Sequence, residues 1–269
     1  MIARVLSFRF LAALIATAVI ATVLPASSAQ AEDREITKRR AAERKTFTDA
    51  QIFDGFFRTA FGAELRFAGN SDRIRKYNVP VRVYVDNRAK PDRSAQVGEV
   101  VADIQSHIAN LDIAITTDRT AANVEVRLIH ERDFARTLTA AFGRDRMRRI
   151  QKSLDPQCLS GFRKDAQFRI QHSDVFLVAD AGDFIFYDCA YEELLQSLGP
   201  INDTDKVPWT MFNDDVQMGF FDVYDQYILN ILYHPRVHAG MTAREVRALL
   251  PQIMPEVRAF VAKVNNLPP

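Results

Sequence analysis

The sequence has almost no net charge, no second long apolar run, and no internal repeat or low-complexity tract. Its 35 basic and 34 acidic residues give a formal net charge of +1, so no overall field favours nucleic acid or an anionic membrane. After the first 31 residues no apolar run is long enough for a stable membrane span. No cysteine lies near residue 31 to carry a lipid.

The first 31 residues have the features of an export signal. Arg4 and Arg9 precede an apolar run over residues 10–24, and Ala29-Gln30-Ala31 offers an A-x-A cleavage site. The run is short for a membrane span. We predict a signal peptide at 1–31 and a periplasmic or secreted protein, with an uncleaved N-terminal anchor as the alternative.

The remaining chain is long enough for one substantial core and a small helical extension. Residues 32–45 are charged and lack apolar periodicity, which predicts a solvated, frayed leader. An N-terminal helical extension is expected over 46–72. Thr48 caps it, and Phe53, Phe57 and Phe61 recur on one face that should pack on the main domain, which spans 73–269.

Apolar periodicity within 73–269 alternates between the patterns of strands and helices. Residues 79–86 and 123–129 alternate as strands around a helical pattern over 94–111, which predicts a β-α-β unit. The fold class is therefore α/β (α+β), a small twisted mixed sheet with packed helices and a helical C-terminal part. Helices are also expected at 131–153, at 183–198 and after Thr242, where Pro251 and Pro255 should interrupt or kink the last helix; further strands are expected at 166–171 and 174–179.

Five basic residues crowd into nine positions of the expected helix at 131–153. A solvated helix face is the ordinary explanation, and a site for an acidic partner is the alternative. No aromatic residues alternate with them, so nucleic-acid binding gains no support. The five are Arg144, Arg146, Arg148, Arg149 and Lys152.

The two cysteines of the chain, Cys158 and Cys189, both lie beyond the export signal. An oxidising compartment makes a disulfide between them the natural prediction. That bridge would tie the helix at 183–198 to the chain before it.

The run CAYEELLQSLGPIND, which begins at Cys189, contains a pattern in which metal ligands have been replaced. Aligned with HExxHxxGxxH, Glu192 and Gln196 take the places of the first two histidines, Glu193 that of the general base, and Asn202 that of the third ligand. A carboxylate and two amides form a poor zinc site, because zinc prefers imidazole and thiolate. The sequence therefore predicts no zinc and no cofactor.

Two further segments extend this resemblance. FDVYDQYILNILYHP, over 221–235, is similar to the segment after the active site of serralysin-type metzincins, and Thr210-Met211-Phe212 stands where those enzymes place a methionine turn. Residues 158–241 resemble an uncharacterised proteobacterial family of exported proteins, a domain of unknown function with the pattern C-x-x-E-E-x-x-Q-x-L-G followed by Asn-Asp. The resemblance implies a zincin-like fold and export, and it implies no reaction.

Other candidate ligands have ordinary explanations. The five histidines fall in separate predicted helices, strands and loops. His234 and His238 are four residues apart, but Pro235 disfavours a continuous helix through them. Residues 202–205 and 213–215 offer oxygen ligands of the kind that calcium accepts, but Asn and Asp also dominate turns. We predict no metal site from them.

These features predict an exported, non-catalytic pseudoenzyme that binds a protein or cell-envelope component. The cleft would be lined by Glu192, Glu193, Gln196, Asn202 and Asp203. The main alternative is a metalloprotease-like hydrolase with Glu193 as general base and a metal held by Glu192, Gln196 and an oxygen of Asn202 or Asp203. A third possibility is a purely structural envelope protein.

Overall fold

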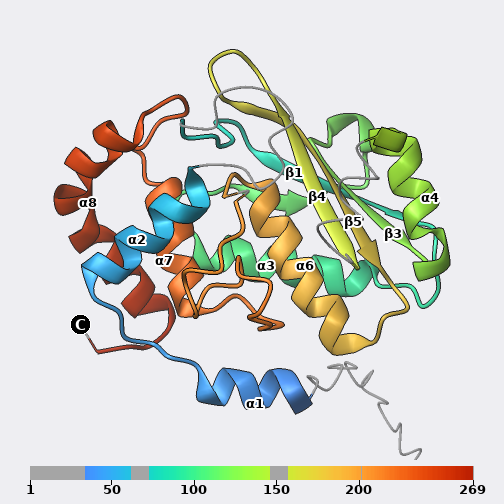
Figure 1. Cartoon of the computed structure of the whole chain (residues 1–269), viewed down its shortest axis with the longest axis horizontal. Coiled ribbons are helices and arrows are strands. Elements are labelled where there is room, and N and C mark those ends of the chain that lie inside the picture. The colour runs from blue at the N-terminus through green and yellow to red at the C-terminus, as the bar shows by residue number, and fades with distance from the viewer. Residues whose placement is uncertain (1–33, 62–72, 146–156, 201, 269) are drawn as a thin grey trace, which may run out of the picture. The chain divides into compact units, whose positions relative to one another are not determined.

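A single mixed sheet organises the part of the chain that the computed structural model describes, which is residues 34–61, 73–145, 157–200 and 202–268. Its strand order is β2-β1-β3-β5-β4 (Figure 1). The first four of these run parallel, and β4 pairs antiparallel with β5. The bounds are β1 Val81–Asn87, β2 Ile113–Ile115, β3 Val124–Ile129, β4 Cys158–Lys164 and β5 Ile170–Val178.

Alternation along the strands gives the sheet two apolar faces of unequal size. Val83, Val126 and Val175 are completely buried in the larger core, as the period of two requires for one face. On the other face Leu159 and Phe176 pack with Phe134 and Leu138 of α4 (Glu131–Phe142) in a smaller cluster. Helices thus cover both faces of the sheet.

The larger core lies beneath α3 (Ser94–His107) and α6 (Asp183–Ser197), which pack against each other and against the strands. Beyond them, α2 (Asp49–Ala60), α7 (Val223–Leu232) and α8 (Ala243–Val264) form a helical layer (Figure 1). The residues of α7 are all buried, so this helix is the centre of the layer. Residues Glu32–Pro269 form one compact unit.

The expected strands agree with the structure in part. Those predicted at 79–86 and 123–129 are β1 and β3, and they pair in parallel around α3 as the β-α-β pattern requires. The strand predicted at 174–179 lies within β5 apart from its last residue, but the separate strand predicted at 166–171 is wrong, because residues 166–167 form a turn and β5 continues without a break from Ile170 to Val178. The prediction missed β2, which has three residues, and β4, whose sequence CLSGFRK lacks a run of β-branched residues.

Three helix predictions also need correction, and the first is the helix expected at 131–153, because α4 ends at Phe142 before Gly143, which has φ +83. The helix after Thr242 is not interrupted, because α8 runs through Pro251 and Pro255 as one helix of 22 residues. Arg247, Pro251 and Pro255 lie four residues apart on the exposed side, where water can satisfy the carbonyls that the prolines leave without an N–H donor. The helix expected to extend to 111 ends at His107, and Leu111 is buried in the loop that follows.

The leader predicted to be solvated and frayed is exposed at most of its described positions, but it is helical and not frayed over much of its length. Residues Arg34–Ala42 form α1, in which Ile36 is 2% exposed. The guanidinium groups of Arg39 and Arg40 lie over the rings of Phe184 and Phe220, at 4.8 and 4.4 Å. Cation–π contacts therefore hold this charged helix on the core, a use of arginine that hydrophobic periodicity does not detect.

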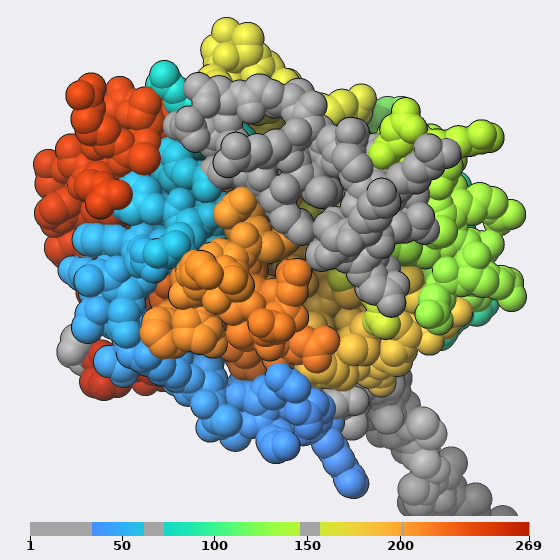
Figure 2. All heavy atoms as spheres, in the orientation of Figure 1, coloured from blue at the N-terminus to red at the C-terminus, as the bar shows by residue number. Residues whose placement is uncertain are grey.

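The predicted extension contains α2, with the capping box at Thr48 and Gln51. Its fully buried face carries Ile52 and Phe56, while Phe53, Phe57 and Phe61 are partly buried against the core. In Figure 2 the N-terminal residues (blue) lie beside residues of the segment that precedes α7 (orange). The proposed signal peptide at 1–31, residues 62–72 and the basic residues from Arg146 to Lys152 lie outside the described residues.

Within the described ranges, no helix combines the length and the apolar character needed to cross a membrane.

Candidate functional site

The helix that carries the degenerate motif is buried on most of its surface. Along α6, Leu194, Leu195 and Ala190 are completely buried, so the helix is held by the core on more than one side. Glu193 and Gln196 are 6% and 7% exposed, whereas Glu192 is half-buried. A disulfide joins Cys189 of α6 to Cys158 of β4, with 5.7 Å between the Cα atoms, as the sequence predicts.

The chain leaves α6 through Gly199, which has φ +140. A Cβ atom there would lie 2.3 Å from the carbonyl oxygen of Arg75. Only glycine combines this backbone conformation with so close an approach, so Gly199 allows the sharp chain reversal at the end of α6.

The segment from Asp203 to Gln217 returns along α6, and buried hydrogen bonds anchor it. Asp225 of α7 accepts hydrogen bonds from the Thr210 hydroxyl at 2.5 Å and the Met211 amide at 2.7 Å. Just beyond the segment, Asp188 of α6 accepts from the amides of Met218 and Gly219 at 2.6 and 3.0 Å. These contacts fix the loop, so the site is preorganised on the side that faces α6.

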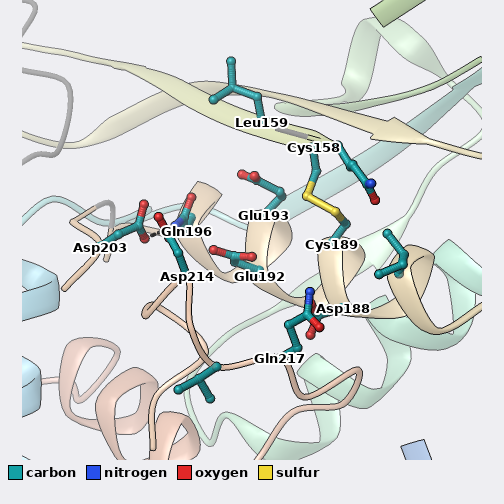
Figure 3. Close-up of a pocket in the computed structure, with 13 residues that line it drawn as sticks. Cys158, Leu159, Asp188, Cys189, Glu192, Glu193, Gln196, Asp203, Asp214 and Gln217 are labelled. Carbon is teal, nitrogen blue, oxygen red and sulfur yellow. Dashed lines mark hydrogen bonds between the residues drawn. A yellow bond between two sulfur atoms is a disulfide. The ribbon is translucent and has the colours of Figure 1, made fainter. Parts of the chain in front are cut away.

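Between β4, α6 and this segment lies a pocket of about 330 Å³ (Figure 3). Five carboxyl side chains line it, and no lysine, arginine or histidine is among its lining residues in the described part of the chain. The carboxyl groups belong to Asp188, Glu192, Glu193, Asp203 and Asp214. The disulfide lines the same pocket and fixes the distance between β4 and α6, which form two of its walls.

Adjacent glutamates of α6 point in different directions within this pocket. Figure 3 shows Glu193 on the side of β4 and Glu192 directed toward Asp214. Residues i and i+1 of a helix do not face each other, so the two carboxylates do not form a dyad.

Gln196 links α6 to the loop. Its Nε2 donates to Asp203 Oδ1 at 2.5 Å, and its Oε1 accepts from the Ser160 hydroxyl at 3.5 Å. With its NH₂ group toward Asp203, the amide acts as a donor that positions the carboxylate. This geometry does not support Gln196 as the metal ligand of the hydrolase alternative.

Three carboxylates converge where α6 meets the loop. Glu192, Asp203 and Asp214 each offer an oxygen within 4.8 Å of the other two. Two ligands at the calcium–oxygen distance of about 2.4 Å lie at most about 4.8 Å apart, so the three can share one divalent cation. An all-oxygen set favours Ca²⁺, Mg²⁺ or Mn²⁺ over zinc. No histidine belongs to this group of described residues.

Asn202 is the predicted cleft residue that the structure places elsewhere. Its Nδ2 donates to the Arg58 carbonyl at 2.7 Å and its amide to the Thr59 carbonyl at 3.3 Å, so it joins the chain to the end of α2. The pocket therefore brings together four of the five predicted residues, namely Glu192, Glu193, Gln196 and Asp203.

Asp188 and Asp214 are the acidic lining residues that the sequence prediction left out of the site. Asp214 lies in the run 213–215 that was considered for calcium and assigned to turn chemistry. Asp188 precedes Cys189 by one residue, and burial raises the pKa of its carboxyl group above the ordinary value. A search for acidic residues one turn before Glu192 would have found Asp188, because positions i and i+4 share a helix face.

Asp222 and Asp225 form a separate pair of carboxyl groups beneath the loop, and neither residue lines the pocket. Asp222 caps α7 by accepting from the amides of Tyr224 and Asp225, and both aspartates are buried. Burial raises the pKa of Asp225 to about 6, and burial together with the charge of Asp225 raises the pKa of Asp222 well above its usual value.

A protein-family model described as "Protein of unknown function (DUF2927)" matches residues 49–252. The match includes α6, the loop and α7. No curated protein and no solved structure matches the chain.

Proposed function

The chain belongs to the DUF2927 family of proteins of unknown function, and from this premise we propose that it is a non-catalytic binding protein. Its ligand is a cationic group of a protein or cell-envelope component, bound in the pocket between β4, α6 and residues 203–217. The observation that carries this proposal is the set of five carboxyl side chains around one cavity. Acidic walls of low dielectric attract cations and favour their binding.

The framework of the pocket supports recognition by a preformed surface. A disulfide joins two of its walls, and Gln196 holds Asp203 at 2.5 Å. Binding to a fixed site loses less conformational freedom than binding to a mobile one. We also propose that the fold is related to that of zincins, which the motif on α6 next to the edge strand β4 supports. A periplasmic or secreted location is proposed as well, and the disulfide supports it.

Titration with tetra-arginine tests the proposal at low ionic strength. The double variant Glu192→Gln/Asp214→Asn removes two charges from the pocket and should weaken binding by about tenfold or more. The matched control, Asp112→Asn/Asp118→Asn, removes two exposed charges far along the sequence from the motif and should leave the affinity within about twofold. Equal affinity in wild type and pocket variant would refute a cationic ligand in this pocket.

The second candidate is a metal-dependent hydrolase, favoured by the convergence of Glu192, Asp203 and Asp214. A cation held there would lower the pKa of a bound water, and Glu193, in the same pocket, would accept its proton. This arrangement keeps Glu192 and Asp203 of the sequence-based alternative and replaces Gln196 with Asp214.

Metal analysis of protein purified without an affinity tag separates the two functions. Stoichiometric metal that is lost in Glu192→Gln, together with casein hydrolysis that is lost in Glu193→Gln, would establish the hydrolase. Metal-free protein that binds tetra-arginine and does not cleave casein would establish the binding protein.

A further inference from the structure

A second cavity, of about 730 Å³, lies between α7, α8 and the segment that joins α1 to α2. It shares no lining residue with the pocket beside α6. Its size falls within the range of about 300–1,000 Å³ that is typical of small-molecule sites.

The floor of this cavity is aromatic, and part of its wall is apolar. Phe47 and Tyr227 are each 4% exposed and form the floor. One stripe of α8 contributes the small side chains of Ala259 and Ala262, and Leu267, whose amide donates to the Ala262 carbonyl at 2.9 Å, adds an apolar side chain just after the end of α8. The surface thus suits a slender apolar group.

All charged residues that line the cavity are basic, in contrast to the pocket beside α6. They are Lys45, Arg258 and Lys263. Arg258 donates to Asp49 and to the Phe47 carbonyl, and the Lys45 ammonium lies 3.7 Å from Glu43. Lys263 is exposed and forms no ion pair with the described residues. Its ammonium is therefore available to an incoming anion.

We propose that this cavity binds a free aliphatic carboxylate of medium chain length. The methylene chain lies over Phe47 and Tyr227 beside Ala259, Ala262 and Leu267, and the carboxylate pairs with Lys263. The apolar floor accounts for the chain, and Lys263, which forms no ion pair with the described residues, accounts for the sign of the head group.

Calorimetric titration of the full chain with octanoate, nonanoate and decanoate, each below its critical micelle concentration, tests both parts of the ligand. Affinity should rise about fourfold for each added methylene while the chain still fits in the cavity. Decanol, which has the same chain and no charge, should bind more weakly than decanoate by about two- to fivefold, as expected for an exposed ion pair.

Variants locate the binding. Ala262→Trp and Ala259→Trp fill the groove from exposed or half-buried positions of α8 and should each reduce decanoate affinity by about tenfold or more. Ala248→Trp places the same ring on an exposed α8 position outside the cavity and should change nothing. Lys263→Ala should lower affinity by about two- to fivefold, while Lys38→Ala, whose side chain is 79% exposed on α1, should not.

Near-UV circular dichroism confirms that each variant is folded. Saturable binding that depends on chain length and is lost in both groove-filling variants supports the proposal. No saturable binding of decanoate to the wild type, or equal binding to the wild type and both tryptophan variants, overturns it. Neither result affects the proposal for the acidic pocket, because the cavities share no residue.

Discussion

The Thr210 hydroxyl donates a hydrogen bond of 2.5 Å to Asp225, and this contact connects the loop beside the motif helix to the centre of the helical layer. Thr210 and Asp225 are both completely buried. The loop contributes Asp203 and Asp214 to the pocket, so the position of these carboxylates depends on a hydrogen bond beneath them.

Thr210→Val should therefore destabilise the protein by about 1–3 kcal/mol, because it leaves a buried Asp225 oxygen without its hydroxyl donor. Urea denaturation measures the free energy of unfolding. Thr139→Val, which removes an exposed hydroxyl bonded to the Ala135 carbonyl, is the control and should change the free energy by less than about 0.5 kcal/mol. Equal losses in the two variants would contradict the role given to Thr210.

The buried pair of Asp222 and Asp225 should make stability fall as pH rises. The folded-state pKa of Asp225 is raised from 3.8 to about 6, so between these values the folded protein binds more protons than the unfolded chain. The contribution is fully present below pH 3.8 and is lost as pH rises through about 6. The pKa of Asp222 is also raised, so the loss of stability continues to higher pH.

Melting temperatures of wild type and Asp222→Asn between pH 4 and 7 measure this effect. The variant has no carboxyl group to ionise at this position, so it should gain stability relative to the wild type as pH rises. Asp112→Asn is the control and should show no such rise between pH 4 and 7, because a hydrogen bond from Arg82 lowers the pKa of Asp112, so this carboxyl group ionises below that range. If the difference in melting temperature between Asp222→Asn and wild type does not vary with pH, the raised pKa values of Asp222 and Asp225 are ruled out.

The disulfide should contribute substantially to stability. It closes a loop with a sequence separation of 31, and the chain-entropy treatment gives about 3–4 kcal/mol for a loop of that length. Cys158→Ser/Cys189→Ser should lose roughly this amount in urea denaturation, and wild type reduced with dithiothreitol should match it. A loss below about 1 kcal/mol would mean that β4 and α6 hold together without the bond.

Gly199→Ala should destabilise the end of α6. The new Cβ would overlap the Arg75 carbonyl at 2.3 Å, and the φ of +140 is one that alanine rarely adopts. We expect a loss of about 1–3 kcal/mol. Gly98→Ala is a matched control inside α3, where a Cβ meets nothing within 4 Å, and it should be neutral or stabilising by about 0.5–1 kcal/mol. Equal stability of Gly199→Ala and wild type would contradict the conformational requirement.

The sequence by itself determined the parts of this protein that follow from local periodicity and from pairing chemistry. Alternation of valines predicted β1 and β3, the capping residues Thr48 and Thr242 predicted the starts of α2 and α8, and the two cysteines predicted their own bond. It also placed Glu192, Glu193 and Gln196 on one helix. These features depend on residues close in the chain or on a single possible partner.

Only the tertiary structure decided which side chains share a cavity. Asp214 joins Glu192 on a loop that buried hydrogen bonds to Asp225 hold in place, and Asn202 lies outside the site, where it bonds to the Arg58 and Thr59 carbonyls. The charged α1 packs because Phe184 and Phe220 accept its arginines. Such contacts join residues far apart in the sequence, and no local pattern encodes the distance between them.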